Sequence, residues 1–210
     1  VVLSFTTADG SAKDGVGESG AGIPDYSAQT GTVTILAGQT SATATIDVPT
    51  SNDNVFEQPE TFTVNLTPVS GTINAGGSDL TGVGTINDND NAPTVSINDV
   101  TVSEGGTAHF TVSLSGPSDQ NVVLSFVTAD GSAKDGVGES GAGIPDYTAQ
   151  TGTVTILAGQ TSATVTIDVP TTNDNVFEQP ESFTVNLTPV SGAINAGGSD
   201  LTGVGTINDN

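Results

Sequence analysis

The sequence of 210 residues contains no cysteine, no methionine, no tryptophan and a single histidine. Without cysteine the chain forms no disulfide and has no thiol nucleophile or thiolate metal ligand. One histidine and two basic residues leave paired carboxylates as the only groups for acid–base chemistry. Glycosidases use such pairs, but they also need a cleft with aromatic side chains, and aromatic residues make up only 4% of this chain. We therefore expect no enzymatic activity.

Positive charge is equally scarce, since 24 acidic residues against two basic residues give a net charge of −22. This acidity excludes ordinary binding to nucleic acids and disfavours anionic membranes. No run of about 18 apolar residues is present, so the sequence predicts no membrane insertion. No signal peptide is recognisable, and Val1 begins within a strand pattern, so we interpret the chain as a fragment.

Only 34% of the residues are hydrophobic, which on its own would suggest disorder. The apolar residues, however, alternate with Thr or Ser, which is typical of strands. In 107–114, for example, Ala108, Phe110, Val112 and Leu114 are expected to point inward and His109 outward. The pattern predicts seven strands in the second part of the chain: 94–98, 107–114, 122–128, 152–157, 162–169, 182–188 and 203–208.

Seven strands in about 120 residues predict an all-β fold, an immunoglobulin-like antiparallel β-sandwich. We expect 99–106 to be a turn, and 152–157 and 162–169 to form a hairpin across Ala158–Thr161. Tyr147 and Phe183 are expected in the core. Asp130 and Asp135 each precede a glycine in a long loop, 129–149, and are expected to bond to nearby backbone.

The sequence repeats itself, because Val1–Asn89 aligns with Val122–Asn210 at a constant offset of 121 (122 − 1 = 121). A repeat of this length predicts a tandem array of domains: 1–90, which lacks its N-terminal strands, and 91–210, which is complete. Asn91–Asn121 has no counterpart before Val1. Either the first copy is cut, which we favour, or this segment serves the first copy in a permuted arrangement. Only six pairs of positions differ: Thr6/Val127, Ser27/Thr148, Ala44/Val165, Ser51/Thr172, Thr61/Ser182 and Thr72/Ala193.

The acidic stretch Thr172–Glu181, TNDNVFEQPE, recurs as Ser51–Glu60. Each copy places three carboxylates within ten residues, with no Lys or Arg nearby. Crowded carboxylates repel one another, and a hard divalent cation with oxygen ligands relieves that repulsion. The stretch therefore predicts a calcium-binding loop. Its acidic residues are Asp174, Glu178 and Glu181 in the second copy, and Asp53, Glu57 and Glu60 in the first.

The predicted topology brings further acidic residues to this loop. If the strands run alternately up and down, the loops after the first, third and fifth strands share one end of the sandwich with the end of the seventh. Those places hold Glu104, Asp146, the loop 172–181 and Asp209. In the first copy the chain leaves from the same end through 87–91, so calcium there would also brace the joint to the next repeat.

With these motifs in place, the sequence resembles the Calx-β family, over 91–210 and, without its opening strands, over 1–90. The resemblance implies a calcium-binding β-sandwich, found in exchanger regulatory domains, integrin β4 and tandem repeats of large bacterial (RTX-type) surface adhesins. The motifs that carry it are Glu104–Gly105, the TADGSA segment Thr128–Ala133, Asp146–Tyr147, the AGQT hairpin, the run D-x₃-E-x₂-E-x-F-x-V-x-L from Asp174 to Leu187, and Thr206–Asn210.

The resemblance also implies a set of calcium ligands. Where richly charged members have consecutive aspartates, this chain has Asn173–Asp174 and Asn208–Asp209–Asn210. The amides remove charge, which favours weak sites of about 10⁻⁴–10⁻³ M that suit an extracellular module. The implied ligands are Glu104, Asp146, Asp174, Glu178, Glu181 and Asp209 in the second copy, and Asp25, Asp53, Glu57, Glu60, Asp88 and Asp90 in the first.

These observations lead us to expect extender repeats of a large secreted adhesin on the bacterial cell surface, stiffened by Ca²⁺. Their partners would be neighbouring repeats of the same chain, while other domains would bind a host or surface ligand. The alternative is a calcium-dependent module that itself binds a glycan or protein through the loop Ala129–Ala149. A cytosolic calcium switch would need tight sites, and the asparagine substitutions argue against it.

Overall fold

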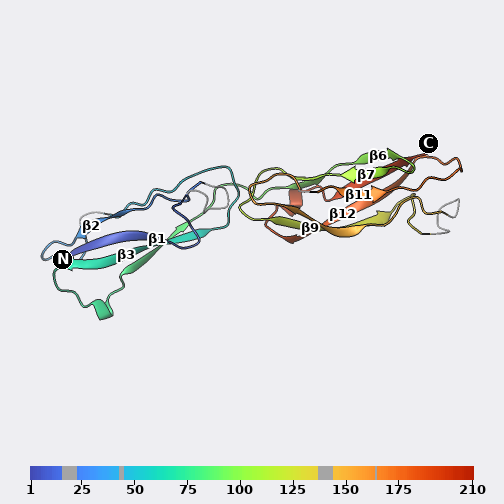
Figure 1. Cartoon of the computed structure of the whole chain (residues 1–210). Coiled ribbons are helices and arrows are strands. Elements are labelled where there is room, and N and C mark those ends of the chain that lie inside the picture. Colours follow the sequence, from blue (N-terminus) through green and yellow to red (C-terminus); the bar gives the residue numbers. More distant parts are fainter. Residues whose placement is uncertain (16–22, 43–44, 137–143, 164) are drawn as a thin grey trace. The chain divides into compact units, whose positions relative to one another are not determined.

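A computed structural model of the chain describes residues 1–15, 23–42, 45–136, 144–163 and 165–210. The chain divides into two compact units, unit 1 (Val1–Asp90) and unit 2 (Asn91–Asn210) (Figure 1). Both are built from strands, and the described part of each contains one short 3-10 helix, η1 (Ala75–Gly77) and η2 (Ala196–Gly198). None of the helices found in the described ranges has the length and apolar character needed to cross a bilayer.

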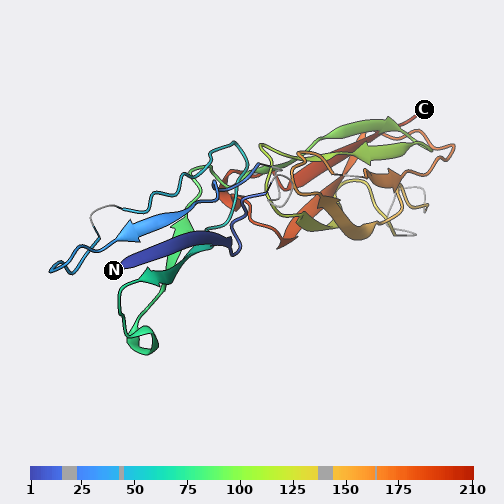
Figure 2. The same ribbon diagram turned by 60° about the vertical axis from the view of Figure 1, so that its left-hand side comes forward.

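Unit 1 contains one four-stranded antiparallel sheet with the strand order β2-β1-β3-β4. The connection between β3 and β4 carries η1 and extends away from the sheet (Figure 2). Strand β4 is an end strand of this sheet. The strands are β1 (Val2–Asp9), β2 (Thr30–Thr34), β3 (Glu60–Ser70) and β4 (Thr81–Ile86).

Unit 2 has two layers of strands. The larger layer has the order β10-β9-β12-β13-β6, and its neighbours are antiparallel except β6, which runs parallel to β13. In the smaller layer β5 pairs with β8 and β7 pairs with β11. The strands are β5 (Val95–Ile97), β6 (Val100–Ser103), β7 (Thr107–Phe110), β8 (Val112–Leu114), β9 (Val122–Asp130), β10 (Thr151–Ile156), β11 (Ile167–Pro170), β12 (Glu181–Ser191) and β13 (Thr202–Asn208).

The apolar core of unit 2 lies between these layers, and the predicted all-β sandwich is confirmed. Alternate residues of β7 and β8 are buried, as expected, while His109 is exposed and its Nδ1 lies 2.8 Å from Asp168 Oδ1. Tyr147 and Phe183 are fully buried, and their rings stack with centroids 4.5 Å apart. Burying one large apolar side chain contributes about 1.5–3 kcal/mol, so these alternating positions account for much of the stability.

The predicted hairpin between 152–157 and 162–169 is wrong. β10 pairs with β9 in the larger layer, whereas β11 pairs with β7 in the smaller one. After the turn at Gly159, the backbone bonds to Val112–Leu114 instead of to β10: Leu114 N donates to Thr161 O and Ala163 N to Val112 O. The turn reverses the chain as predicted, but β11, which follows it, forms its hydrogen bonds with β7 in the smaller layer.

The predicted turn at 99–106 contains a strand. β6 pairs with β13 with Val100 opposite Gly205, and Val100 and Val102 pack against the core. Asn98 and Asp99 turn the chain from one layer to the other, and Asp99 Oδ1 accepts a hydrogen bond from Val204 N at 2.8 Å. Four residues before a Gly-Gly turn carry too little periodicity to be recognised as a strand.

The segment Asn91–Asn121 belongs to unit 2. Its strands pair with β13 and β11 of that unit, and its Phe110 packs edge-on against Phe183 with ring centroids 6.0 Å apart. The permuted arrangement, in which this segment would complete the first copy, is therefore not the one the structure adopts.

Candidate metal centre

Six acidic side chains from four separate stretches of unit 2 line one small hollow at an end of the sandwich. Its volume is about 10 Å³, the room of a single water-sized sphere. The stretches are the turn after β6, the loop between β9 and β10, the connection from β11 into β12, and the residues after β13. The acidic lining consists of Glu104, Asp146, Asp174, Glu178, Glu181 and Asp209.

Three of these carboxylates are close enough to share one ion. Oxygens of Asp146, Glu178 and Glu181 all lie within 4.8 Å of one another. Calcium binds oxygen at 2.3–2.6 Å, so two ligands of one ion are at most about 5 Å apart. The donor set consists of hard carboxylate oxygens, and calcium prefers these ligands. The arrangement therefore fits a divalent cation of this kind.

Backbone bonds hold Asp146 in place. Lys134 N donates to Asp146 Oδ2 at 2.6 Å, and Asp146 N donates to Lys134 O at 2.7 Å. The next residue, Tyr147, donates its hydroxyl to Asp130 Oδ1 at 2.7 Å. One Asp146 oxygen is thereby directed at the backbone, which leaves the other for an ion.

Glu104 reaches the hollow because the chain turns sharply after β6. Gly105 has φ +71°, in the left-handed region that favours glycine, and a Cβ there would lie 3.0 Å from Asn173 Cβ. Glu104 N donates to Asn208 O at 2.9 Å, which joins this turn to the end of β13. The backbone N–H of Asp174 donates to the Glu104 carboxylate. The turn, the loop after β11 and the end of β13 are thus connected around the site.

Burial, together with the neighbouring acids, raises the pKa of three of these carboxyl groups, those of Glu104, Glu178 and Glu181. Burial raises the pKa of Glu181 to about 7, with further contributions from the charge of Asp146, a hydrogen bond to it, and the charge of Glu178. Burial and the neighbouring acids also raise the pKa of Glu178 and of Glu104. Without a cation, it is therefore unfavourable for all these carboxylates to be ionised at the same time. A bound divalent ion offsets this repulsion.

We expect the metal-free protein to lose stability as the pH rises from about 4.5 to about 7. Between its ordinary pKa and the raised value of about 7, the Glu181 carboxyl keeps its proton in the folded state but loses it on unfolding. The stabilisation is complete below this range and absent above it. Urea unfolding at several pH values in calcium-free buffer measures the effect. Glu181→Gln should flatten the profile, and an equally steep profile in that variant would contradict the assignment.

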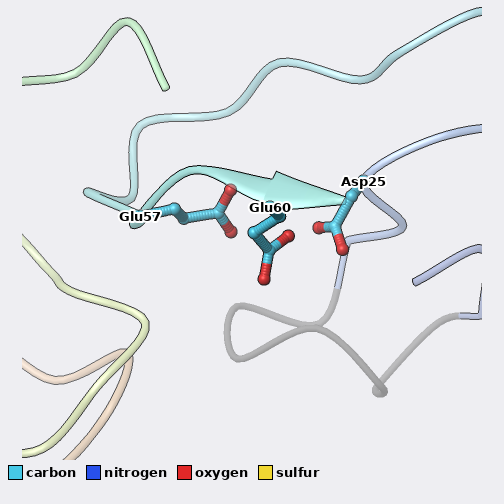
Figure 3. A group of neighbouring side chains, drawn as sticks. All are labelled: Asp25, Glu57 and Glu60. Atoms are coloured by element: carbon cyan, nitrogen blue, oxygen red, sulfur yellow. The ribbon is translucent and has the colours of Figure 1, made fainter. Parts of the chain in front are cut away.

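Unit 1 carries a similar group at the same positions of the repeat. Oxygens of Asp25, Glu57 and Glu60 lie within 4.8 Å of one another, and Figure 3 shows the Glu60 carboxyl between the other two. Asp53 and Asp88 line a hollow together with Asp25 and Glu57, and this hollow is wider than that of unit 2, at about 190 Å³. Glu60 is not among the described residues that line it. In unit 2 Glu104 also lines the hollow, and the described residues of unit 1 include no equivalent of Glu104.

Asp90, also a predicted ligand, does not belong to the lining of this hollow among the described residues. Instead, its N–H donates to Asp88 Oδ1 at 3.0 Å.

The structure adds features that the sequence did not reveal. Gln179 and Thr172 also line the hollow of unit 2, and both carry oxygen atoms that suit a hard cation. In the sequence, the position of Gln179 within the acidic stretch 172–181 was the feature that could have indicated its place in the site. The side chain of Asp130 bonds to nearby backbone, as expected, because its Oδ1 accepts a hydrogen bond from Asp135 N at 3.2 Å, whereas Asp135 contributes its backbone N–H to this bond. Glu139, another acidic residue of the predicted loop 129–149, lies outside the described residues.

Residues 1–86 and 88–207 match the Calx-beta domain model. The chain belongs to the Calx-beta family. Members of this family are calcium-binding regulatory domains and not enzymes, so the family suggests a calcium-binding β-sandwich module. Each unit has a cluster of carboxylate oxygens, the ligands that calcium prefers, and this agrees with a calcium-binding module.

The chain is also similar to several solved structures, one of which is described as a calcium-binding domain. The apo-form Calx CBD1 domain has a TM-score of 0.42 and 19% identity, and the match covers 56% of this chain and 98% of that one. For CBD12 of CALX1.1 the TM-score is 0.33, with 19% identity over 90% and 66% of the two chains. A two-domain protein of unknown function from Bacteroides fragilis has a TM-score of 0.36 and 10% identity, with coverage of 57% and 46%. No curated protein matches the chain.

Proposed function

We propose that both units are calcium-binding extender repeats of a large secreted adhesin on a bacterial cell surface. The observation that carries this proposal is the convergence of six acidic side chains from four stretches of unit 2 on one hollow. The near-identity of the two copies supports a spacer, because a spacer needs only to repeat. The absence of cysteine is consistent with a secreted domain that is stabilised by metal instead of disulfides.

In each unit the carboxylates would hold the ion. Asp146, Glu178 and Glu181 are the principal ligands of unit 2, and Glu104, Asp174 and Asp209 line the same hollow. Bound calcium supplies positive charge that allows all these groups to be ionised together. The neutral Asn173 and Asn210, which bond to each other through their amides, keep the charge of the site moderate. Such sites suit the millimolar calcium found outside cells.

The joint between repeats depends on Asp88 in this proposal. Asp88 Oδ2 accepts a hydrogen bond from Glu57 N at 2.9 Å, and its Oδ1 accepts one from Asp90 N. Asp90 is the last residue of unit 1, so ordering of this hollow by calcium also orders the residues that lead into Asn91. Neighbouring repeats are thus the partners of each unit, and other domains of the protein bind the host or surface ligand.

Residual dipolar couplings test the stiffening of the joint. With saturating calcium, one alignment tensor should describe both units, and without calcium two should be needed. Asp88→Asn is expected to require two tensors even with calcium. Asp209→Asn changes the equivalent residue of unit 2, which is not at this joint, and should keep a single tensor. Two independent tensors for the unaltered chain in saturating calcium would contradict the extender role.

A calcium-dependent ligand-binding module is the second candidate, and one observation favours it. Phe177 and Val176 are 78% and 50% exposed in the loop that supplies the ligands. Calcium would fix this loop, so an apolar contact made by Phe177 would depend on calcium. Binding of the chain to glycan and protein arrays with and without calcium distinguishes the two candidates. An extender gives no signal, whereas a ligand-binding module gives one that Phe177→Ala removes.

A further inference from the structure

The turn that follows β9 contains a carboxylate that the acidic hollow does not use. Asp130 ends β9 and begins the turn 130–135, DGSAKD, and it is not among the described residues that line the hollow. Its Oδ1 instead accepts two hydrogen bonds, one from the Tyr147 hydroxyl at 2.7 Å and one from Asp135 N at 3.2 Å. Because Tyr147 is only 1% exposed, these bonds close the turn and attach it to the core.

This turn holds one of the three close carboxylates directly. Lys134 N donates to Asp146 Oδ2 at 2.6 Å, and Asp146 N donates to Lys134 O at 2.7 Å. The first bond engages one side-chain oxygen of Asp146, and the position of Lys134 thereby sets the direction of the other. Asp146 directly precedes Tyr147 in the chain, so the bond to Asp130 and the bonds to Lys134 restrain the same short stretch.

The same turn also holds the start of β12, which carries a second of these carboxylates. Ser132 Oγ accepts a hydrogen bond from Ser182 N at 2.8 Å, and Ala133 N donates to Ser182 O at 2.9 Å. Ser182 directly follows Glu181. The two backbones lie very close, because a Cβ on Gly131 would be 2.4 Å from Ser182 O. One turn therefore bonds to two of the stretches that supply the close carboxylates.

Unit 1 contains the same hydrogen bonds. The Tyr26 hydroxyl and Asp14 N donate to Asp9 Oδ1 at 2.7 and 3.2 Å, and Lys13 N donates to Asp25 Oδ2 at 2.6 Å. The two hollows nevertheless differ in volume, at about 190 Å³ in unit 1 and about 10 Å³ in unit 2. The turn therefore keeps its bonds in a wide hollow and in a narrow one, so its geometry does not depend on how closely the other ligands approach.

We infer that Asp130, and Asp9 in unit 1, are positioning residues of the calcium site. Asp130 acts through the two hydrogen bonds that its Oδ1 accepts, and not as a ligand. These bonds keep the turn in the shape that places Lys134 N against Asp146 and fixes the start of β12, so the ligands are close together before the ion binds. Ligands that are already ordered lose less conformational freedom on binding, which raises the affinity. The inference rests on the proposed calcium function.

Calcium titrations of the full chain by NMR test this inference, because the two sites of one molecule can be compared. The copies differ at Ser51 and Thr172, which line the hollows of unit 1 and unit 2, so these two amide signals report the two sites separately. Asp130→Ala is expected to weaken binding at the Thr172 site by about 10–100-fold, the usual loss when a partner that orients a metal ligand is removed. Binding at the Ser51 site should not change, and Asp9→Ala should give the reverse result.

Two further variants separate positioning from charge and from folding. Asp130→Asn removes the charge but keeps an acceptor oxygen. It should bind calcium within about threefold of the unaltered chain, because salt weakens the effect of a charge that is not a ligand. Tyr147→Phe keeps the ring and removes only the hydroxyl, so it should weaken binding in the same direction as Asp130→Ala. Calcium-free spectra show whether unit 2 is folded in each variant, and Tyr147→Phe is the deciding variant if Asp130→Ala does not fold.

Three results would overturn the inference and leave the calcium function intact. The first is an unchanged affinity in the deciding variant, which would limit the turn to a role in stability. The second is an equal loss in Asp130→Asn and Asp130→Ala, which would assign the effect to charge or to direct coordination. The third is an equal loss at the Thr172 and Ser51 sites in Asp130→Ala. If neither signal of the unaltered chain responds to calcium, the proposed function itself fails, and the inference fails with it.

Discussion

Calcium at about one hundred times its dissociation constant should raise the melting temperature of unit 2 by about 10 °C, and Glu181→Gln should remove most of this rise. An ion that binds only the folded state at this concentration adds about 2.7 kcal/mol. For a domain of this size, 1 kcal/mol corresponds to about 4 °C. Glu181 lies in the triad of close carboxylates with Asp146 and Glu178, so its loss removes a central ligand. Scanning calorimetry with calcium, magnesium and neither ion measures the effect.

The matched control is Glu60→Gln, which changes the same position of the repeat in unit 1. It should remove the calcium response of the unit 1 transition and leave that of unit 2 intact. A full calcium response of unit 2 in the Glu181→Gln protein would show that the ion binds elsewhere. Equal stabilisation by magnesium would point to general screening of the net charge of −22 instead of a site.

Gly203→Val should destabilise unit 2 by about 1–3 kcal/mol, the range for overpacked cores, whereas Gly82→Val should leave unit 1 as stable or make it slightly more stable. At Gly203 the added side chain would collide with Asn98 O and Phe110. At Gly82 there is open space, and valine is favoured over glycine in a strand.

A second pair of glycines provides the control for position in the strand. A Cβ on Gly84 or on Gly205 would lie 2.3 Å from the ring of Phe62 or Phe183 of its own sheet. Valine at either position should therefore destabilise its own unit. Urea unfolding of the four variants compares them directly. A large loss of stability in Gly82→Val would mean that the sheet of unit 1 is covered in solution.

Alternation of apolar residues with Thr and Ser predicted most strands of unit 2, but it missed β6 and did not indicate the layer to which each strand belongs. Alternation indicates that one face of a strand is buried. A strand in either layer of a sandwich has one buried face, so the pattern does not distinguish the two layers. The tetrapeptide IDVP shows the limit, because Ile167–Pro170 is a strand and Ile46–Pro49 is not. Its structure depends on a partner far away in the sequence, as does the crossing of the chain between β10 and β11.

The acidic residues were easier to predict than the contacts that position them. Glu178 and Glu181 stand out by composition, and the alternation of strand directions indicated that Glu104 and Asp209 would come to the same end. Asp146 is held by a hydrogen bond from the backbone N–H of Lys134, and the Tyr147 hydroxyl donates to Asp130. These bonds depend on the path of a long loop, which no local pattern specifies.

Equilibrium dialysis against radioactive calcium tests the central claim most directly, since it counts the ions that the protein binds. The unaltered chain is expected to bind calcium at millimolar or lower concentration, with at least one ion in unit 2 that the double variant Glu178→Gln/Glu181→Gln no longer binds. No bound calcium at several millimolar, or the same number of ions in the double variant, would contradict the account.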